Sequence, residues 1–251
     1  MAALQPQHGD LHAERDLLKV GSYNIHRCIG SDMHHDIERV ARVIGELNCD
    51  TVGLQEVDTL DRQIDALAAA TGMRSISAPT PPSEARPLSN ALLTTREVGQ
   101  VRSYDLTVRG REPRGALEVE LSAGAKSVRV IVTHLGLSAA ERRAQVQKLL
   151  TVIHGIPQDD PVVILGDINE WWPLGRPLRW LHRALGKAPS GRSFPVWAPV
   201  LALDRLWCRP ADRLLSVEVH RSSSARAASD HFPVKAIVAP DAVRGGHGGG
   251  A

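Results

Sequence analysis

The sequence is poor in the residues that mark several protein classes. Its three cysteines, Cys28, Cys49 and Cys208, are odd in number, and no two of them have CxxC spacing. Such a sparse count argues against a disulfide framework, and the spacing does not match a structural zinc site. The sequence therefore differs from small disulfide-rich scaffolds and from zinc-binding modules.

Long apolar runs and a secretory leader are also missing. No run approaches the roughly 18 apolar residues that a transmembrane helix needs. The first sixteen residues include Asp10, Glu14 and Asp16 and lack the apolar centre of a signal peptide. We therefore expect a cytoplasmic protein, monomeric and without stable membrane insertion.

The total charge of the chain is nearly balanced. The formal net charge is +2 and the pI is near 8.6. This mild basicity is compatible with an anionic substrate, but it is not the signature of a nucleic-acid-binding protein. No linker dense in proline, glycine or serine divides the 251 residues. We expect residues 1–15 and the Gly-rich residues 241–251 to be disordered, and residues 16–240 to form one domain.

Strand-like and helix-like patterns alternate through the body of the chain. Apolar positions between 37 and 47 follow helical spacing, and Ser138 and Glu141 form a capping box that opens a helix to about His154. Further helices are expected at 64–70, closed by Gly72, and at 174–185, while the proline-rich residues 79–87 suggest a loop. Strands are expected at 17–24, 51–54, 89–94, 98–106, 115–121, 127–133, 162–165, 201–207, 214–220 and 232–238. Mixed sheets with helices outside favour an α/β fold, a four-layer α/β/β/α sandwich of two packed sheets.

Eight polar residues border the apolar runs of the predicted strands. They are Asn24, Glu56, His134, Asp167, Asn169, Asp204, Asp230 and His231. A polar residue at a strand tip lies at the rim of a sheet rather than in its core. Several such tips on neighbouring strands would place carboxylates, amides and imidazoles in one cleft, which suits a hard divalent cation and a phosphate.

The residue types of these motifs match distinct chemical roles. A carboxylate at Glu56 and an amide at Asn24 suit Mg²⁺, which prefers oxygen ligands. In GDIN, Asp167 could orient a water while Asn169 donates to a phosphoryl oxygen, although an Asx-turn at a strand end gives the same letters. Adjacent Asp230 and His231 side chains diverge, so Asp204 is the better partner for His231. His134 could protonate a leaving alkoxide.

Six motifs stand in a fixed order along the chain. They are YNIH, LQEVD, THLGLS with ERRAQ downstream, LGDINE, ALDRLW and SDHFPV. Together they resemble the endonuclease/exonuclease/phosphatase superfamily, the metal-dependent group with the DNase I-like fold, over residues 17–238. The resemblance implies an active site at one edge of the paired sheets and Mg²⁺-dependent cleavage of a phosphoester by an activated water. Mn²⁺ is a possible substitute. The stretch RSFPVWAPVLALDRLW is most similar to compact bacterial members, whose substrates the motifs do not define.

The resemblance also implies roles for individual positions. It assigns Asn24 and Glu56 to the metal site and Asp230 with His231 to the closing motif, where we expect Asp230 to face the metal or the catalytic water. His134 corresponds to the general acid or phosphate-binding histidine, Asp167 and Asn169 to the pair that orients water and phosphate, and Asp204 to the support of His231. Arg114 corresponds to a donor before a central strand, with Arg111 as the alternative. The family's glutamate that orients the first histidine is not identified, although Glu84 is a candidate. Val57 and Asp58 stand where members acting on abasic DNA carry a lysine.

Three functions are compatible with these residues. The first is a Mg²⁺-dependent phosphodiesterase that acts on nucleic acid. The second keeps the chemistry but takes a phospholipid or inositol-phosphate headgroup, and an exposed Trp171–Trp172 pair would favour it. The same pair could instead stack on a base or pack beneath the rim of the cleft. The third is a non-catalytic binding module, which would be missing one or more of the ligands above.

Overall fold

The computed structural model describes residues 17–77, 88–124 and 126–241. The segments expected to be disordered, apart from Asp241, and the proline-rich loop 79–87 with Glu84 lie outside the described residues. None of the described helices is both long and apolar enough to cross a bilayer.

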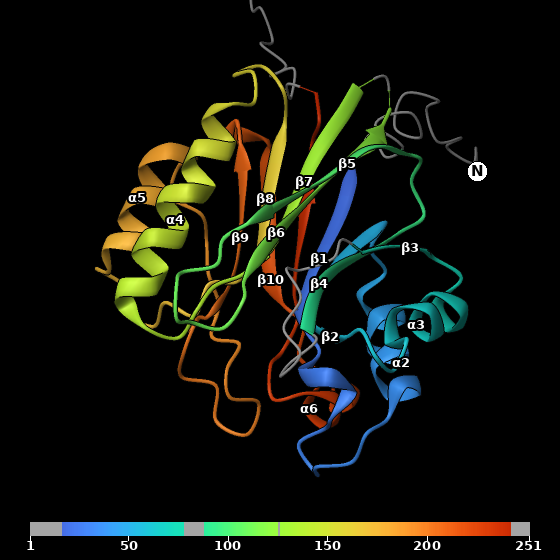
Figure 1. Cartoon of the computed structure of the whole chain (residues 1–251). Coiled ribbons are helices and arrows are strands. Elements are labelled where there is room, and N and C mark those ends of the chain that lie inside the picture. The colour runs from blue at the N-terminus through green and yellow to red at the C-terminus, as the bar shows by residue number, and fades with distance from the viewer. Residues whose placement is uncertain (1–16, 78–87, 125, 242–251) are drawn as a thin grey trace, which may run out of the picture.

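Two mixed sheets form the centre of the molecule (Figure 1). The first sheet has the order β10 (Leu214–Val219), β11 (Val234–Val238), β1 (Leu18–Asn24), β2 (Thr51–Asp58), β4 (Leu88–Thr94) and β3 (Arg74–Ser77). The second has the order β5 (Val98–Asp105), β6 (Gly115–Ala123), β7 (Lys126–His134), β8 (Val162–Asp167) and β9 (Asp204–Arg209). Within each sheet one pair is parallel, β1 with β2 and β7 with β8, and the other pairs are antiparallel.

Helices cover the outer face of each sheet (Figure 1). The first sheet carries α2 (Ile37–Leu47), α3 (Gln63–Thr71) and the short α6 (Ser223–Ala228), and the second carries α4 (Ala139–His154) and α5 (Arg176–Leu185). Short 3-10 turns occupy His26–Cys28 and Ala211–Arg213. The predicted caps are present. Ser138 Oγ accepts from the Glu141 N–H at 3.2 Å, and Gly72 ends α3 in the left-handed conformation that glycine adopts easily.

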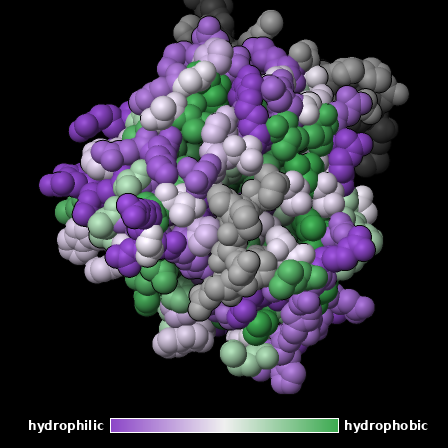
Figure 2. Space-filling model, in the orientation of Figure 1, coloured by the Kyte–Doolittle hydropathy of each residue, from purple (hydrophilic) through white to green (hydrophobic). Residues whose placement is uncertain are grey.

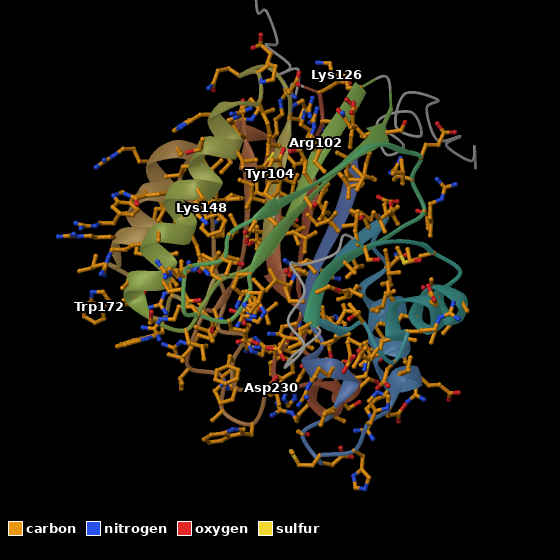
Figure 3. All side chains as sticks on the ribbon, in the orientation of Figure 1. Arg102, Tyr104, Lys126, Lys148, Trp172 and Asp230 are labelled. Atoms are coloured by element: carbon orange, nitrogen blue, oxygen red, sulfur yellow. The ribbon has the colours of Figure 1, made fainter. Side chains whose placement is uncertain are left out.

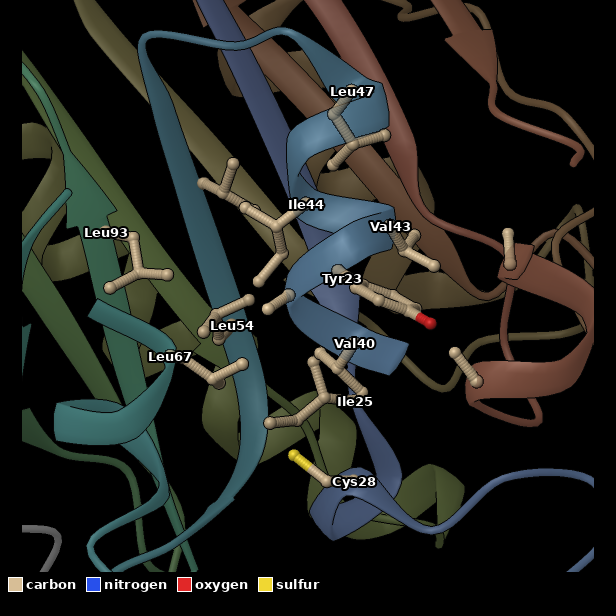
Figure 4. Close-up of a cluster of buried hydrophobic side chains, with 14 of the residues drawn as sticks. Tyr23, Ile25, Cys28, Val40, Val43, Ile44, Leu47, Leu54, Leu67 and Leu93 are labelled. Atoms are coloured by element: carbon tan, nitrogen blue, oxygen red, sulfur yellow. The ribbon is translucent and has the colours of Figure 1, made fainter. Parts of the chain in front are cut away.

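Three apolar layers hold this arrangement together. Figure 4 shows the layer between the first sheet and its helices, where Tyr23 and Leu54 from the strands meet Val40 and Ile44 of α2. Buried aliphatic residues from both sheets fill the space between the sheets, and a third cluster lies beneath α4 and α5. The chain therefore forms the four-layer sandwich that its sequence predicts.

Some element boundaries differ from the sequence-based expectation. The strand predicted at 201–207 begins only at Asp204, because Leu201 instead pairs with Phe194 across an isolated bridge. The strand predicted at 51–54 continues to Asp58 and so contains Glu56. β3 and α6 were not expected from the sequence, because they are too short to show a clear period.

The strand registers bring the polar tips to one edge of the sandwich. In the first sheet Asn24 stands opposite Gln55, and in the second His134 stands opposite Asp167. Because β9 runs antiparallel to β8, its first residue, Asp204, is the one opposite Asp167. The carboxyl ends of parallel strands and the amino end of an antiparallel neighbour therefore meet at the same place.

Candidate active site

Glu56 reaches the site through an irregularity in β2. The register with β4 shifts between Leu54 and Val57, and Glu56 adopts a positive φ of 58°. A bulge of this kind changes the direction of a side chain within a strand. At this position Glu56 Oε1 accepts a hydrogen bond from Asn24 Nδ2 at 3.2 Å.

Asp167 lies at the centre of the site and contacts residues from three other segments. Its Oδ2 accepts from Asn24 Nδ2 at 3.1 Å, and it lies 3.5 Å from His134 Nε2 and 3.7 Å from His231 Nε2. The Asn169 N–H donates to the other oxygen at 2.9 Å. Burial of the carboxylate raises the pKa of Asp167 to about 6, although nearby His231 opposes the rise. A carboxylate with this pKa is suited to accept a proton near neutral pH.

His231 forms a buried pair with Asp204. Its Nδ1 lies 2.8 Å from Asp204 Oδ2, and the Ser193 hydroxyl donates to the same oxygen at 2.6 Å. Burial by itself lowers the pKa of His231, but the charges of Asp204 and Asp167 outweigh burial and raise it to about 10. The imidazole is therefore a cation at neutral pH, and Phe194 packs against it with 4.6 Å between ring centres.

His134 lies on the other side of Asp167 in a different environment. Arg114 Nη1 is 3.4 Å from its Nδ1, and Asn169 Nδ2 is 3.1 Å from its Nε2. A second hydrogen bond from Asn169 Nδ2 to the Leu135 carbonyl, at 2.8 Å, fixes this amide. Burial, then the positive charges of Arg114 and His231, hold the pKa of His134 well below its usual value. The site thus contains one charged and one neutral imidazole.

The oxygen donors of the site fit a divalent metal ion. Glu56 Oε1 and Asp167 Oδ2 both accept hydrogen bonds from the Asn24 NH₂ group, so two carboxylate oxygens lie close together. Such hard donors are what Mg²⁺ prefers, and the Glu56 side chain is 22% exposed, which leaves access for water and a substrate oxygen. Asn24 itself directs its NH₂ group to the carboxylates, while its oxygen accepts from the His26 N–H.

A second acidic cluster is better explained without a metal. Possible ligand atoms of Asp167, Asp204 and His231 lie within 4.8 Å of one another. However, His231 Nδ1 already pairs with Asp204, and a protonated imidazole has no free electron pair for a cation. We therefore interpret this trio as a histidine–carboxylate pair beside the central Asp167.

Asp230 is more exposed than the other acidic residues of the site. Asp230 has a side chain that is 39% exposed, and its nearest ionic neighbour among the described residues is His26, at 3.8 Å. Arg114 is buried and contacts His134, whereas the alternative Arg111 is exposed at a turn. Trp171 and Trp172 are both more than half exposed, so neither packs beneath the rim of the cleft.

Several residues that support the site received no role from the sequence. Ser193 bonds Asp204, and Ser229 Oγ donates to the Asn24 carbonyl at 2.7 Å. Arg142 forms a buried ion pair with Glu170 at 3.2 Å, which joins the loop after His134 to the loop after Asn169. Arg142 and Glu170 belong to the ERRAQ and LGDINE motifs, so their positions were visible, but their pairing was not.

The comparisons with known proteins agree with this geometry. A model of the Endonuclease/Exonuclease/phosphatase family matches residues 21–231. The uncharacterized protein YbhP of Escherichia coli K12 is 31% identical over 159 residues, which cover 59% of this chain and 62% of YbhP. The match thus spans less than two thirds of that relative.

Solved structures share the fold at low identity. An endonuclease/exonuclease/phosphatase from Beutenbergia cavernae has a TM-score of 0.70 and 23% identity, over 90% of this chain and 72% of its own. The mannosyl-6-phosphatase Bt3783 of Bacteroides thetaiotaomicron has a TM-score of 0.71 and 16% identity, over 88% of this chain and 99% of its own. The fold is therefore that of these phosphoesterases, and with a family match that covers most of its length, the chain belongs to the endonuclease/exonuclease/phosphatase family.

Proposed function

We propose that this protein is a Mg²⁺-dependent phosphodiesterase that hydrolyses its substrate by attack of water. The observation that carries the proposal is the convergence on Asp167, where side chains from both sheets lie within hydrogen-bonding or ionic distance of one carboxylate. A non-catalytic binding module would have no need for two buried histidines in opposite charge states beside such a carboxylate.

The residues divide the chemistry among them. Asp167, with its raised pKa, orients a water and takes its proton. The cationic His231, held by Asp204, binds the phosphoryl oxygens and stabilises the charge that develops on them. His134 lies on the opposite side of Asp167 with Asn169 and Arg114 around it, where it can bind the leaving oxygen.

Glu56 is the main candidate for holding the metal ion, with Asn24 and Asp230 as the further predicted ligands. A bound Mg²⁺, or Mn²⁺ in its place, supplies a Lewis acid that polarises the phosphoryl group. The part of Asn24 that the structure places against Glu56 and Asp167 is its NH₂ group, which holds the two carboxylates in position.

Two substrate classes are candidates for the site. The sequence predicts nucleic acid as the substrate, and it predicts a monomeric protein in the cytoplasm. A phospholipid or inositol-phosphate headgroup is the second candidate, and the exposure of Trp171 and Trp172 favours it. A related structure is a mannosyl-6-phosphatase, so a phosphomonoester is a necessary comparison substrate.

The proposal is tested with purified full-length protein. Hydrolysis of bis(p-nitrophenyl) phosphate and p-nitrophenyl phosphate is measured with Mg²⁺, with Mn²⁺ and after EDTA treatment. We expect the diester to be cleaved faster than the monoester, and we expect EDTA to stop turnover of both. Glu56→Gln, Asp167→Asn and His231→Ala should each lower kcat by about 100-fold or more.

A matched control separates chemistry from folding. His34 is an exposed histidine whose side chain is 80% accessible, so His34→Ala should leave both kcat and the melting temperature unchanged. Turnover that survives EDTA would contradict the proposed dependence on a metal ion. Full activity in folded Asp167→Asn would contradict the proposed role of Asp167.

A further inference from the structure

Two loops at the site edge expose large apolar side chains. These side chains, called here the apolar rim, are Trp171, Trp172 and Leu174 after β8, and Trp197 and Val200 before β9; they are 54–79% exposed. The two loops leave the sheet side by side, because the Ile168 N–H donates to the Leu203 carbonyl at 2.9 Å. Exposed apolar groups gathered on one edge indicate a contact surface rather than scattered surface residues.

The apolar rim is attached directly to the site. Phe194, at the base of the second loop, packs on the His231 ring. In the first loop the Trp172 N–H donates to Glu170, the residue after Asn169. Figure 3 shows Trp172 at the left edge of the molecule and Asp230 at the lower centre. The two loops of the rim are therefore joined to the site through Phe194 and Glu170.

The same part of the chain is strongly cationic. Residues 171–203 contain no aspartate or glutamate but include Arg176, Arg179, Arg183, Lys187 and Arg192, all exposed. This segment has a formal charge of +5, whereas the whole chain has +2. Within α5 the three arginines follow helical spacing opposite the buried Leu178 and Leu181, so they form one outward stripe. Figure 2 shows hydrophilic residues over α4 and α5 on the left of the view.

The apolar rim together with the neighbouring arginines fits an anionic bilayer better than a nucleic acid. Trp171 and Trp172 meet edge to face, at 70° and 6.3 Å, and so do not form a pair of parallel faces for bases. Leu174 and Val200 have no ring to stack, but they can enter acyl chains. Tryptophan is enriched at the membrane interface, and arginine is attracted to anionic headgroups.

We propose that the apolar rim and the arginine stripe of α5 dock on an anionic phospholipid surface, so that the site acts on a headgroup phosphodiester. This inference rests on the proposed function, since it names the substrate class of the same site. The rim would enter the interface while the arginines bind lipid phosphates, which places a headgroup beside His231 and Asp167.

The binding test is co-sedimentation of the full chain with vesicles. Vesicles of phosphatidylcholine alone are compared with vesicles of equal parts phosphatidylcholine and phosphatidylglycerol. We expect binding to the mixed vesicles only. Arg176→Glu with Arg179→Glu should weaken binding by at least about fivefold for each arginine, and Trp171→Ala with Trp197→Ala by a similar or larger factor.

Matched controls lie at the opposite edge of the sandwich. Leu215→Ala removes an exposed apolar side chain on β10, and Arg74→Glu reverses an exposed charge on β3; neither should change binding. Mg²⁺-dependent hydrolysis of soluble bis(p-nitrophenyl) phosphate should be the same in the rim variants and in the wild type, because the rim does not touch the reacting groups.

The outcomes distinguish this inference from the proposed function. Hydrolysis of the soluble diester without vesicle binding would overturn the docking surface and leave the chemistry intact. Vesicle binding without any hydrolysis would support the surface and refute the proposed function. If the rim variants instead lose binding to a single-stranded oligonucleotide while vesicles fail to bind the wild type, the surface serves nucleic acid and our inference is wrong.

Discussion

The buried pair of Arg142 and Glu170 offers a quantitative test of how the site is held. Arg142 Nε lies 3.2 Å from Glu170 Oε2, and both residues are only 3% exposed. Arg142 Nη1 also donates to the Gly136 and Leu137 carbonyls, just after His134. Glu170 accepts from the Trp172 N–H, just after Asn169. One ion pair therefore fastens the loop that follows His134 to the loop that carries Asn169.

The change Arg142→Met should lower the free energy of unfolding by about 3–5 kcal/mol, because it leaves a carboxylate buried without its partner. A loss of this size is compatible with a folded protein, since domains are typically stable by about 5–15 kcal/mol. Glu170→Gln should cost less, about 1–3 kcal/mol, because its single amide oxygen keeps one of the two hydrogen bonds, from Trp172 or from Arg142. In the double variant we expect a coupling of about 1–3 kcal/mol between the two positions.

Urea denaturation followed by circular dichroism measures these values. The exposed pair of Arg62 and Asp65 is the control, with side chains 82% and 53% accessible. Arg62→Met should change the free energy of unfolding by less than about 0.5 kcal/mol. In the folded Arg142→Met protein, kcat for bis(p-nitrophenyl) phosphate should fall by about 10- to 100-fold, because small displacements of reacting groups are costly.

Two results would refute this reasoning. A loss of less than about 1 kcal/mol for Arg142→Met would show that the pair does not hold the loops together. Strict additivity in the double variant would show that the two residues act independently. Reduced stability with unchanged kcat would confine the pair to a structural role.

Two further predictions concern residues that take no part in the proposed reaction themselves. Burial raises the pKa of Glu46, but hydrogen bonds from Ser222 and His220 outweigh burial and lower it to about 2 from the usual 4.5. Since the folded-state pKa is depressed, this stabilisation is present above about pH 4.5 and is lost toward pH 2. Glu46→Gln should therefore lower the free energy of unfolding by about 1–2 kcal/mol at pH 7, and by progressively less in urea denaturation at lower pH. A difference that stays constant across that pH range would contradict this prediction. Gly166 has a φ of 147°, and an added Cβ would collide with the Thr133 carbonyl oxygen, so Gly166→Ala should lower the melting temperature strongly. Gly45→Ala in α2, where nothing lies within 4 Å, should instead raise stability by about 0.5–1 kcal/mol, and calorimetry that shows the two changes to be equal would refute the steric argument.

The sequence by itself determined the class of fold and named the residues that meet at the candidate site. Apolar runs of strand length and helical spacing depend on local residue order, so the layers could be predicted without coordinates. The cap that Ser138 provides is equally local, and the structure contains its hydrogen bond with the Glu141 N–H. The polar residues at the strand tips could be named for the same reason, because a tip is defined by the run that it borders.

Only the tertiary structure decided how those residues meet and what charge each one carries. Glu56 reaches the site through a bulge that depends on pairing with β4, and Asp204 begins a strand because Leu201 pairs elsewhere. Arg142 and Glu170 are 28 positions apart, so no local pattern announces their contact. The contrast between His134 and His231 arises from burial and from neighbours on other strands. Desolvation and Coulomb interactions depend on distances in space, which sequence spacing does not contain.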